Sequence, residues 1–249
     1  MTTTGSKPPS NPDEGNPAEG SPPEAQAPSV AGEASASIPP EAGTPSSAPE
    51  AAAKKGAAAI AAKIIAEQQT SAVSSHGAAL LDDKPTVSTQ AARVLEEIAT
   101  QKPEMLVPQV DRICTGLFSS NARVVQTCAV ALPHLARVAP ARVARQLQTL
   151  TDSFPKASEM GKDGLVRTFA ALCAASVAYQ KRLEPALEVA LSTADPKTLA
   201  RWTEIVLPAL KGEPHAAARA VVEKRLATLP RPVAQGIADF LGVKLRVTR

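Results

Sequence analysis

From residue 86 onward, apolar residues recur at helical spacing, and no stretch shows the strict alternation of a half-buried strand. When the chain is compared with itself, a period of 35 to 40 residues emerges. Two sets of apolar residues persist through every repeat: Leu95, Leu132, Leu172 and Leu207, and then Val110, Leu147, Leu187 and Val222. This pattern predicts an array of helical repeats, in which each unit buries its apolar face against the next.

Each repeat is predicted to be a pair of helices. The first helix of each pair is expected near residues 87–101, 121–138, 162–179 and 196–210. The second helices are expected near residues 104–118, 141–154, 182–193 and 214–228, and a last helix near 232–242 would close the stack.

Several residues mark where these helices begin. Pro103 and Pro214 suit a first helical turn, where the missing N–H is not needed. Asp195 before Pro196 forms an N-cap and N1 pair. Two further candidate caps open the second and third repeats: Asn121 and Asp163.

The helix-pair period, the apolar spacing, the Pro inside the first helix and the small cap residue before it resemble HEAT repeats. Pro133 in ALPHL falls on Pro208 in VLPAL, whereas the third repeat has Cys173 at that position and Gln180 in place of the linker Pro. The resemblance covers residues 86–244. It implies an all-α fold, a right-handed α-solenoid of about four HEAT-like helix pairs plus a C-terminal capping helix.

Residues 1–50 differ in composition from the repeats. They hold 11 of the 23 prolines, one lysine and seven acidic residues, so their net charge is −6 and the rest of the chain carries +9. Their apolar residues are mostly Ala, too small to offset an ordering entropy of ~1–2 kcal/mol per residue. We expect a disordered Pro/Ala/Glu-rich tail, which either keeps the chain soluble or offers PxxP-type ligands.

Residues 51–85 are predicted to form an Ala-rich basic helix followed by a linker. The helix has a narrow apolar stripe: Ala53, Ala57, Ile60, Ala61 and Ile64. It either packs on the first repeat, forms a partly helical linker, or docks on a partner or, with weak affinity, on an anionic membrane surface. Residues 70–85 are expected to form a loop with an apolar patch at Leu80 and Leu81. The predicted domains are therefore 1–50, 51–85 and the repeat domain 86–249.

Candidate chemistry is sparse, so we expect neither a metal, a cofactor nor catalysis. His76, His134 and His215 are far apart in the sequence, and no Cys-x-x-Cys motif occurs. Three cysteines lie at apolar helix positions and are expected to be buried: Cys114, Cys128 and Cys173. The segment MGKDG at 160–164 resembles the end of a phosphate-binding loop but has Asp163 where Ser or Thr is required.

Nothing in the sequence predicts a membrane or secretory segment. No run of about 18 apolar residues occurs, and the N-terminus lacks a basic region followed by an apolar one. We therefore expect a cytoplasmic protein without a membrane span.

Two surfaces are candidates for binding. The outward positions of the second helices mix polar and charged residues, and they give a candidate partner surface: Gln109, Arg112, Gln146, Thr149, Glu188 and Glu223. Basic residues gather instead at the turns between paired helices, as a candidate basic ridge: Arg137, Arg142, Arg145, Lys181 and Arg182.

The favoured function is a non-enzymatic scaffold that binds a protein partner on its repeat surface. The alternative is a nucleic-acid-binding solenoid that uses the basic ridge, with weak affinity. An enzyme of the HEAT-like DNA glycosylase type would need an aromatic cleft with a carboxylate. A single Trp202 with no expected aromatic neighbour argues against that class.

Overall fold

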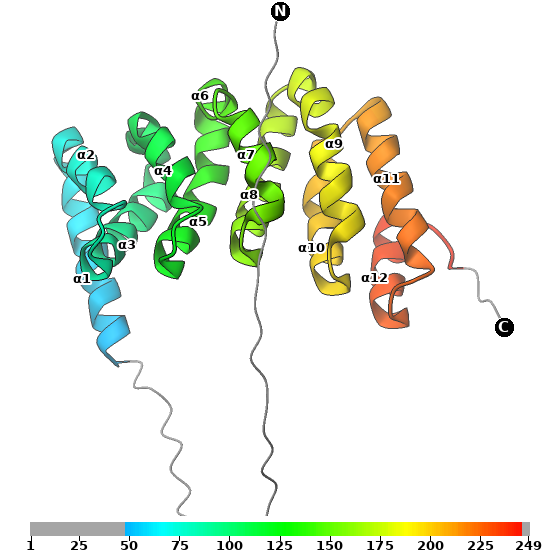
Figure 1. Cartoon of the computed structure of the whole chain (residues 1–249), viewed down its shortest axis with the longest axis horizontal. Coiled ribbons are helices and arrows are strands. Elements are labelled where there is room, and N and C mark those ends of the chain that lie inside the picture. Colours follow the sequence, from blue (N-terminus) through cyan, green and yellow to red (C-terminus); the bar gives the residue numbers. More distant parts are fainter. Residues whose placement is uncertain (1–47, 246–249) are drawn as a thin grey trace, which may run out of the picture. The chain divides into compact units, whose positions relative to one another are not determined.

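Helices make up all the regular secondary structure in the part of the chain that the structure, a computed structural model, describes, residues 48–245 (Figure 1). The tail predicted at 1–50 lies outside this range except for its last three residues. The all-α repeat fold expected from the sequence is confirmed.

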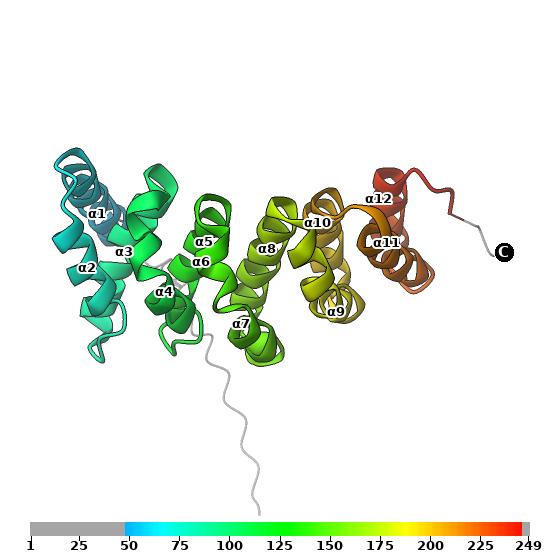
Figure 2. The same cartoon turned by 90° about the horizontal axis from the view of Figure 1, so that it is seen from above.

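The helices alternate between two layers, which Figures 1 and 2 show from two directions. The first-helix layer is built from the helices that begin a pair, together with the last helix, α12: α1 (Ala48–Ala66), α3 (Pro85–Gln101), α5 (Ala122–Val138), α8 (Glu159–Ala175), α10 (Pro196–Val206) and α12 (Arg231–Leu241). The second-helix layer holds their partners: α2 (Thr70–Ala79), α4 (Val110–Gly116), α6 (Pro140–Ala144), α7 (Leu147–Ser153), α9 (Val177–Thr193) and α11 (Gly212–Leu226). Three 3-10 segments complete the set: η1 (Pro103–Gln109), η2 (Phe154–Lys156) and η3 (Leu207–Ala209).

Packing between repeats is strongest in the first-helix layer. Each of its helices contacts the next one along the chain, and the α5–α8 contact is the most extensive in the described residues. One cause is Gly164 on α8, where a Cβ atom would lie 2.5 Å from the Cα of Ala129 on α5. The missing side chain therefore lets the two backbones approach closely.

The predicted register of the core is confirmed. Both recurrent apolar sets are buried, and none of their eight members exposes more than 3% of its surface. Burying an aliphatic side chain of this size contributes roughly 1.5–3 kcal/mol. These two rows therefore form the continuous core that joins one repeat to the next.

Most of the predicted helix starts are also confirmed. The Asn121 carboxamide oxygen accepts a hydrogen bond from the Arg123 N–H at 3.0 Å and caps α5. Asp195 accepts from the N–H groups of Lys197 and Thr198 and caps α10. Pro103 begins η1, and Pro214 lies in the first turn of α11.

The expected cap at Asp163 is wrong. Ser158 caps α8 instead, because its hydroxyl accepts from the Gly161 N–H at 3.2 Å. The helix therefore begins at Glu159, and Asp163 lies inside it. The predicted end of this helix near residue 179 is wrong as well, since α8 stops at Ala175 and Ser176 caps α9. The apolar pattern runs across this boundary without a break, which hides the turn.

The loop expected at 70–85 is also wrong in its first part, because residues 70–79 form α2. The turn before α2 holds Gln68 in the left-handed region at φ 48°, a conformation that its sequence does not signal. The apolar stripe of α1 packs on α3 and buries Ala57, Ala61 and Ile64. Residues 48–79 therefore add a helix pair before the first predicted repeat.

Gln180, at the position where the two preceding repeats have a linker Pro, stabilises the turn of the third repeat through side-chain hydrogen bonds. Its buried side-chain amide donates to the carbonyl oxygens of Cys173 at 2.9 Å and Ala209 at 3.3 Å. Its carbonyl oxygen accepts from the Lys211 N–H at 3.1 Å. The side chain thus ties together the turns of two consecutive repeats and satisfies their backbone groups.

Candidate functional site

The structure separates the candidate partner surface into exposed and buried residues. Arg112, Thr149, Glu188 and Glu223 are exposed on the second-helix layer. Gln109 was expected to point outward, but it is only 3% exposed. Its amide donates to the Ser74 hydroxyl at 3.2 Å, because α2 covers this end of the layer. The missed helix α2 is the reason for this error.

A second part of that surface is occupied by contacts between repeats. The Asp111 carboxylate on α4 pairs with Arg142 at 2.9 Å and accepts from the Gln146 amide at 2.8 Å. By contrast, Glu223 pairs with Arg219 at 2.7 Å inside a single helix, α11. These groups satisfy one another, so the face is partly engaged in holding neighbouring repeats in register.

The candidate basic ridge is largely open. Arg137, Arg145, Lys181 and Arg182 are exposed, whereas Arg142 is half-buried in its pair with Asp111. Arg137, Arg142 and Arg145 lie at or shortly after the turn from α5 to α6, and Lys181 and Arg182 lie within α9, shortly after the turn from α8. These turns share one edge because the helices alternate in direction. Val138 and Val177 at the same turns are 40% and 59% exposed. The ridge therefore mixes positive charge with apolar surface.

Asp163 forms a cluster that sequence reasoning missed. Its carboxylate accepts from the indole N–H of Trp202 at 2.9 Å and pairs with Arg167 at 2.9 Å and Arg201 at 2.7 Å. Trp202 is buried and lies 6.4 Å from Phe154 between ring centroids. The expectation that Trp202 has no aromatic neighbour is therefore wrong. Its burial makes it a core residue that fixes α10 on α8.

The thiols and imidazoles are in structural settings. All three cysteines are free and buried, as expected. Burial raises the pKa of Cys114 to about 12, with a smaller contribution from the Asp111 charge. Burial also raises the pKa of Cys173 to about 12. Both thiols are therefore protonated and unreactive at neutral pH. Burial lowers the pKa of His134, and the nearby Arg137 lowers it further. His134 is therefore neutral at pH 7.

Among residues 48–245, no group of three or more His, Cys, Asp or Glu side chains is placed to hold a metal ion. Within the same residues, none of the helices combines the length and hydropathy needed to cross a bilayer.

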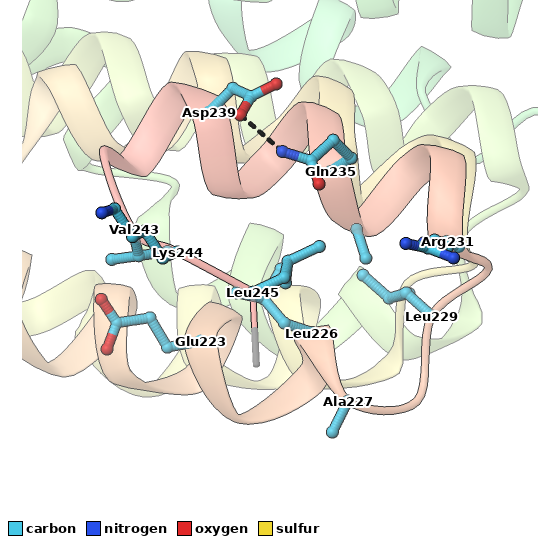
Figure 3. Close-up of a pocket in the computed structure, with 11 residues that line it drawn as sticks. Glu223, Leu226, Ala227, Leu229, Arg231, Gln235, Asp239, Val243, Lys244 and Leu245 are labelled. Carbon is cyan, nitrogen blue, oxygen red and sulfur yellow. Dashed lines mark hydrogen bonds between the residues drawn. The ribbon is translucent and has the colours of Figure 1, made fainter. Parts of the chain in front are cut away.

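A cavity with a volume of about 980 Å³ lies between α11 and α12, the last two helices of the described residues (Figure 3). Leu226 and Leu245 occupy its middle, Glu223 and Lys244 lie toward one end, and Leu229 lies toward the other, beside Arg231. This side of α11 and α12 is uncovered, because no second-layer helix follows α12 within the described residues. Its charges are balanced and form no catalytic arrangement.

Known proteins resemble this chain in structure but not in sequence. No protein-family model matches it, and no curated protein sequence matches it. An engineered protein is similar at a TM-score of 0.57 and 18% identity, over 76% of this chain and 86% of that one. A designed armadillo repeat protein is similar at 0.57 and 18%, over 80% of this chain and 95% of that one. These likenesses support a helical-repeat α-solenoid and do not single out HEAT repeats.

Proposed function

We propose that the chain is a non-enzymatic cytoplasmic scaffold of HEAT-like repeats, and that it binds a protein partner on its repeat surface. The exposed members of the candidate partner surface would contact that partner: Arg112, Thr149, Glu188 and Glu223. Buried free thiols accord with a reducing compartment.

The observation that carries this proposal is an exposed apolar residue on the second-helix layer. Val189 on α9 exposes 47% of its surface directly beside Glu188. Together with the uncharged Thr149 and the opposite charges of Arg112 and Glu188, it gives a face of mixed chemistry. Such a mixture of apolar, polar and oppositely charged groups suits a protein partner, whereas a phosphate backbone requires predominantly positive charge.

Affinity capture tests the proposal directly. The immobilised full chain is used, because α1 and α2 pack on the repeats. Extract is passed over it with and without nuclease, and the retained proteins are identified. We expect the same protein to be retained under both conditions. Loss of all retained protein on nuclease treatment would show nucleic-acid bridging and would contradict the proposal.

A nucleic-acid function remains the second candidate, because four residues of the basic ridge are exposed. Each phosphate contact adds about −0.7 to −0.9 to the slope of log affinity against log salt. Five basic groups therefore allow a slope of at most about 4.5 in magnitude. Fluorescent duplex and single-strand titrations measure this slope. Tight binding at physiological salt that is lost when the ridge is changed to Ala would favour this function over the protein scaffold.

A further inference from the structure

The first-helix layer carries a groove that lies outside the candidate partner surface and shares one residue, Arg137, with the candidate basic ridge. It crosses α5, α8 and α10 and has a volume of about 520 Å³. Its floor consists of three alanines on α8: Ala170, Ala171 and Ala174. One wall includes Val130 and Pro133 from α5, and the other includes Ile205 of α10 and Pro208 of η3.

The hollow is a consequence of the small residues on α8. An Ala side chain ends at Cβ, so the surface of α8 lies below the longer side chains of its two neighbours. Gly164 on the same helix brings α8 close to Ala129 of α5. The groove is thus formed by helices whose positions the core fixes, and it does not need to open before it can bind a ligand.

The charge in the groove has one sign. Arg137 and Arg167 line it, and none of the described residues that line it is acidic. Arg167 shares the single carboxylate of Asp163 with Arg201. Arg137 is exposed and has no ion-pair partner within residues 48–245. The groove therefore holds positive charge that the described residues do not balance.

We propose that this groove binds an acidic peptide segment, which inserts one or two apolar side chains over the alanine floor. A volume of about 520 Å³ falls in the range of roughly 300–1,000 Å³ typical of ligand sites. A carboxylate of the peptide pairs with Arg137, whose planar guanidinium group suits carboxylates, while Arg167, already paired with Asp163, adds to the positive charge of the groove. His134 is the one residue with an aromatic ring among those that line the groove, and no Phe, Tyr or Trp accompanies it to form a stacking platform for successive bases, which disfavours a nucleic acid.

This inference deepens the proposed scaffold function and rests on it, since it names the chemistry of one segment of a protein partner. It assigns that segment to the first-helix layer, on the side of the molecule away from the candidate partner surface on the second helices. A partner can occupy either layer without the other, so the two proposals can fail separately.

Fluorescence anisotropy with defined peptides tests the inference on the full chain. The probe is a short fluorescein-labelled peptide in which Leu or Trp is flanked on both sides by Glu. Its two matched peptides carry Lys in place of Glu, or Ala in place of the apolar residue. We expect saturable binding of the first peptide, with affinity at least about tenfold weaker for both matched peptides, because each lacks one of the two interactions.

Two single variants address the groove itself. Arg137→Glu reverses an exposed charge, and Ala174→Trp fills the hollow from an exposed position, so neither change disturbs the core. Their matched controls lie on α11, where Lys224→Glu and Ala216→Trp make the same kinds of change at exposed positions. Each groove variant should weaken binding about tenfold or more, and each control should leave it within about twofold.

The outcomes separate the two proposals. Saturable binding that is lost in either groove variant and kept in both controls supports the groove. No binding of the Glu-flanked peptides, or equal binding by Ala174→Trp and by the wild-type chain, overturns the groove. The scaffold proposal survives that result if nuclease-resistant capture of a protein persists.

Discussion

The two helix layers of this chain are built from the same repeat and both contain ion pairs, yet they differ at the surfaces that are candidates for binding. On the second-helix layer, Asp111 binds Arg142 and Gln146 of the following repeat, so part of the face holds its neighbours in place. On the first-helix layer, the α5–α8–α10 groove presents Arg137 without an ion-pair partner within the described residues.

This difference distinguishes charged groups that hold the fold together from charged groups that remain available to a ligand. A charged group that already has a partner offers little further energy to a ligand, since an incoming group must first displace that partner. An unpaired guanidinium beside an apolar hollow has no such competitor. The comparison therefore ranks the groove above the central part of the second-helix layer as a place for a ligand with carboxylates. The following tests run from the largest expected effect to the smallest.

The first test addresses the core that both layers share. Leu147 is 2% exposed on α7, so Leu147→Asp buries an unpaired charge. The substitution should cost several kcal/mol and abolish the cooperative melt followed by circular dichroism. Thr149→Asp, an exposed change on the same helix, is the control and should stay within about 0.5 kcal/mol of wild type. A native-like melt for Leu147→Asp would contradict the repeat register.

The second test addresses the close packing that is specific to the first-helix layer. Gly164→Ala places a Cβ 2.5 Å from the backbone of Ala129, which should cost roughly 1–3 kcal/mol. Gly236→Ala on α12 meets nothing within 4 Å and should stabilise the protein by roughly 0.5–1 kcal/mol through helix propensity. Chemical denaturation measures both changes. Equal effects at the two sites would show that α5 and α8 are not in tight contact.

A third pair of variants compares the same residue type on the two layers. Asp163→Ala leaves the buried indole N–H of Trp202 without its acceptor and should cost roughly 1–3 kcal/mol. Asp163→Asn keeps an acceptor oxygen and should recover part of that loss. Asp111→Ala removes exposed contacts and should cost less than about 1 kcal/mol. If Asp111→Ala proves the more costly change, the second-helix layer depends on its polar contacts more than this comparison allows.

The smallest effect concerns pH. Folding lowers the pKa of His134 below its ordinary value of 6.5, so the unfolded chain binds more protons in the window just below 6.5. Stability should therefore fall as the pH falls through this window. Between pH 7 and pH 5.5, the melting temperature of His134→Gln should decrease by less than that of the wild type. Identical losses in the two proteins would show that His134 does not contribute.

The sequence predicted features that depend on one repeat at a time. The caps at Asn121 and Asp195 and the buried row that includes Leu147 follow from local signals and spacing. Helix α2 escaped prediction because its segment TSAVSSHGAA combines weak helix formers with a narrow apolar face. Its tertiary contact with α3, which no local signal encodes, stabilises it.

The candidate site was harder to predict because it depends on contacts between repeats. Gln109 lies at an outward position in its own repeat, and only the packing of α2 buries it. Asp163 is a residue type that often caps helices. Its actual role is to accept a hydrogen bond from Trp202, which lies 39 positions further along the chain. The groove forms because the alanines on α8 are shorter than the neighbouring side chains of α5 and α10. The sequence of any one helix does not show this difference in side-chain length.

Affinity capture with both layers blocked tests the central claim, that the repeat surface binds protein, most directly. Thr149→Trp obstructs the second-helix layer and Ala174→Trp fills the groove, and both positions are exposed. After nuclease treatment, the wild-type full chain should retain a protein that the doubly blocked chain does not retain, while both chains show the same circular dichroism. Retention of the same protein by both chains, or of none by the wild type, would contradict the account.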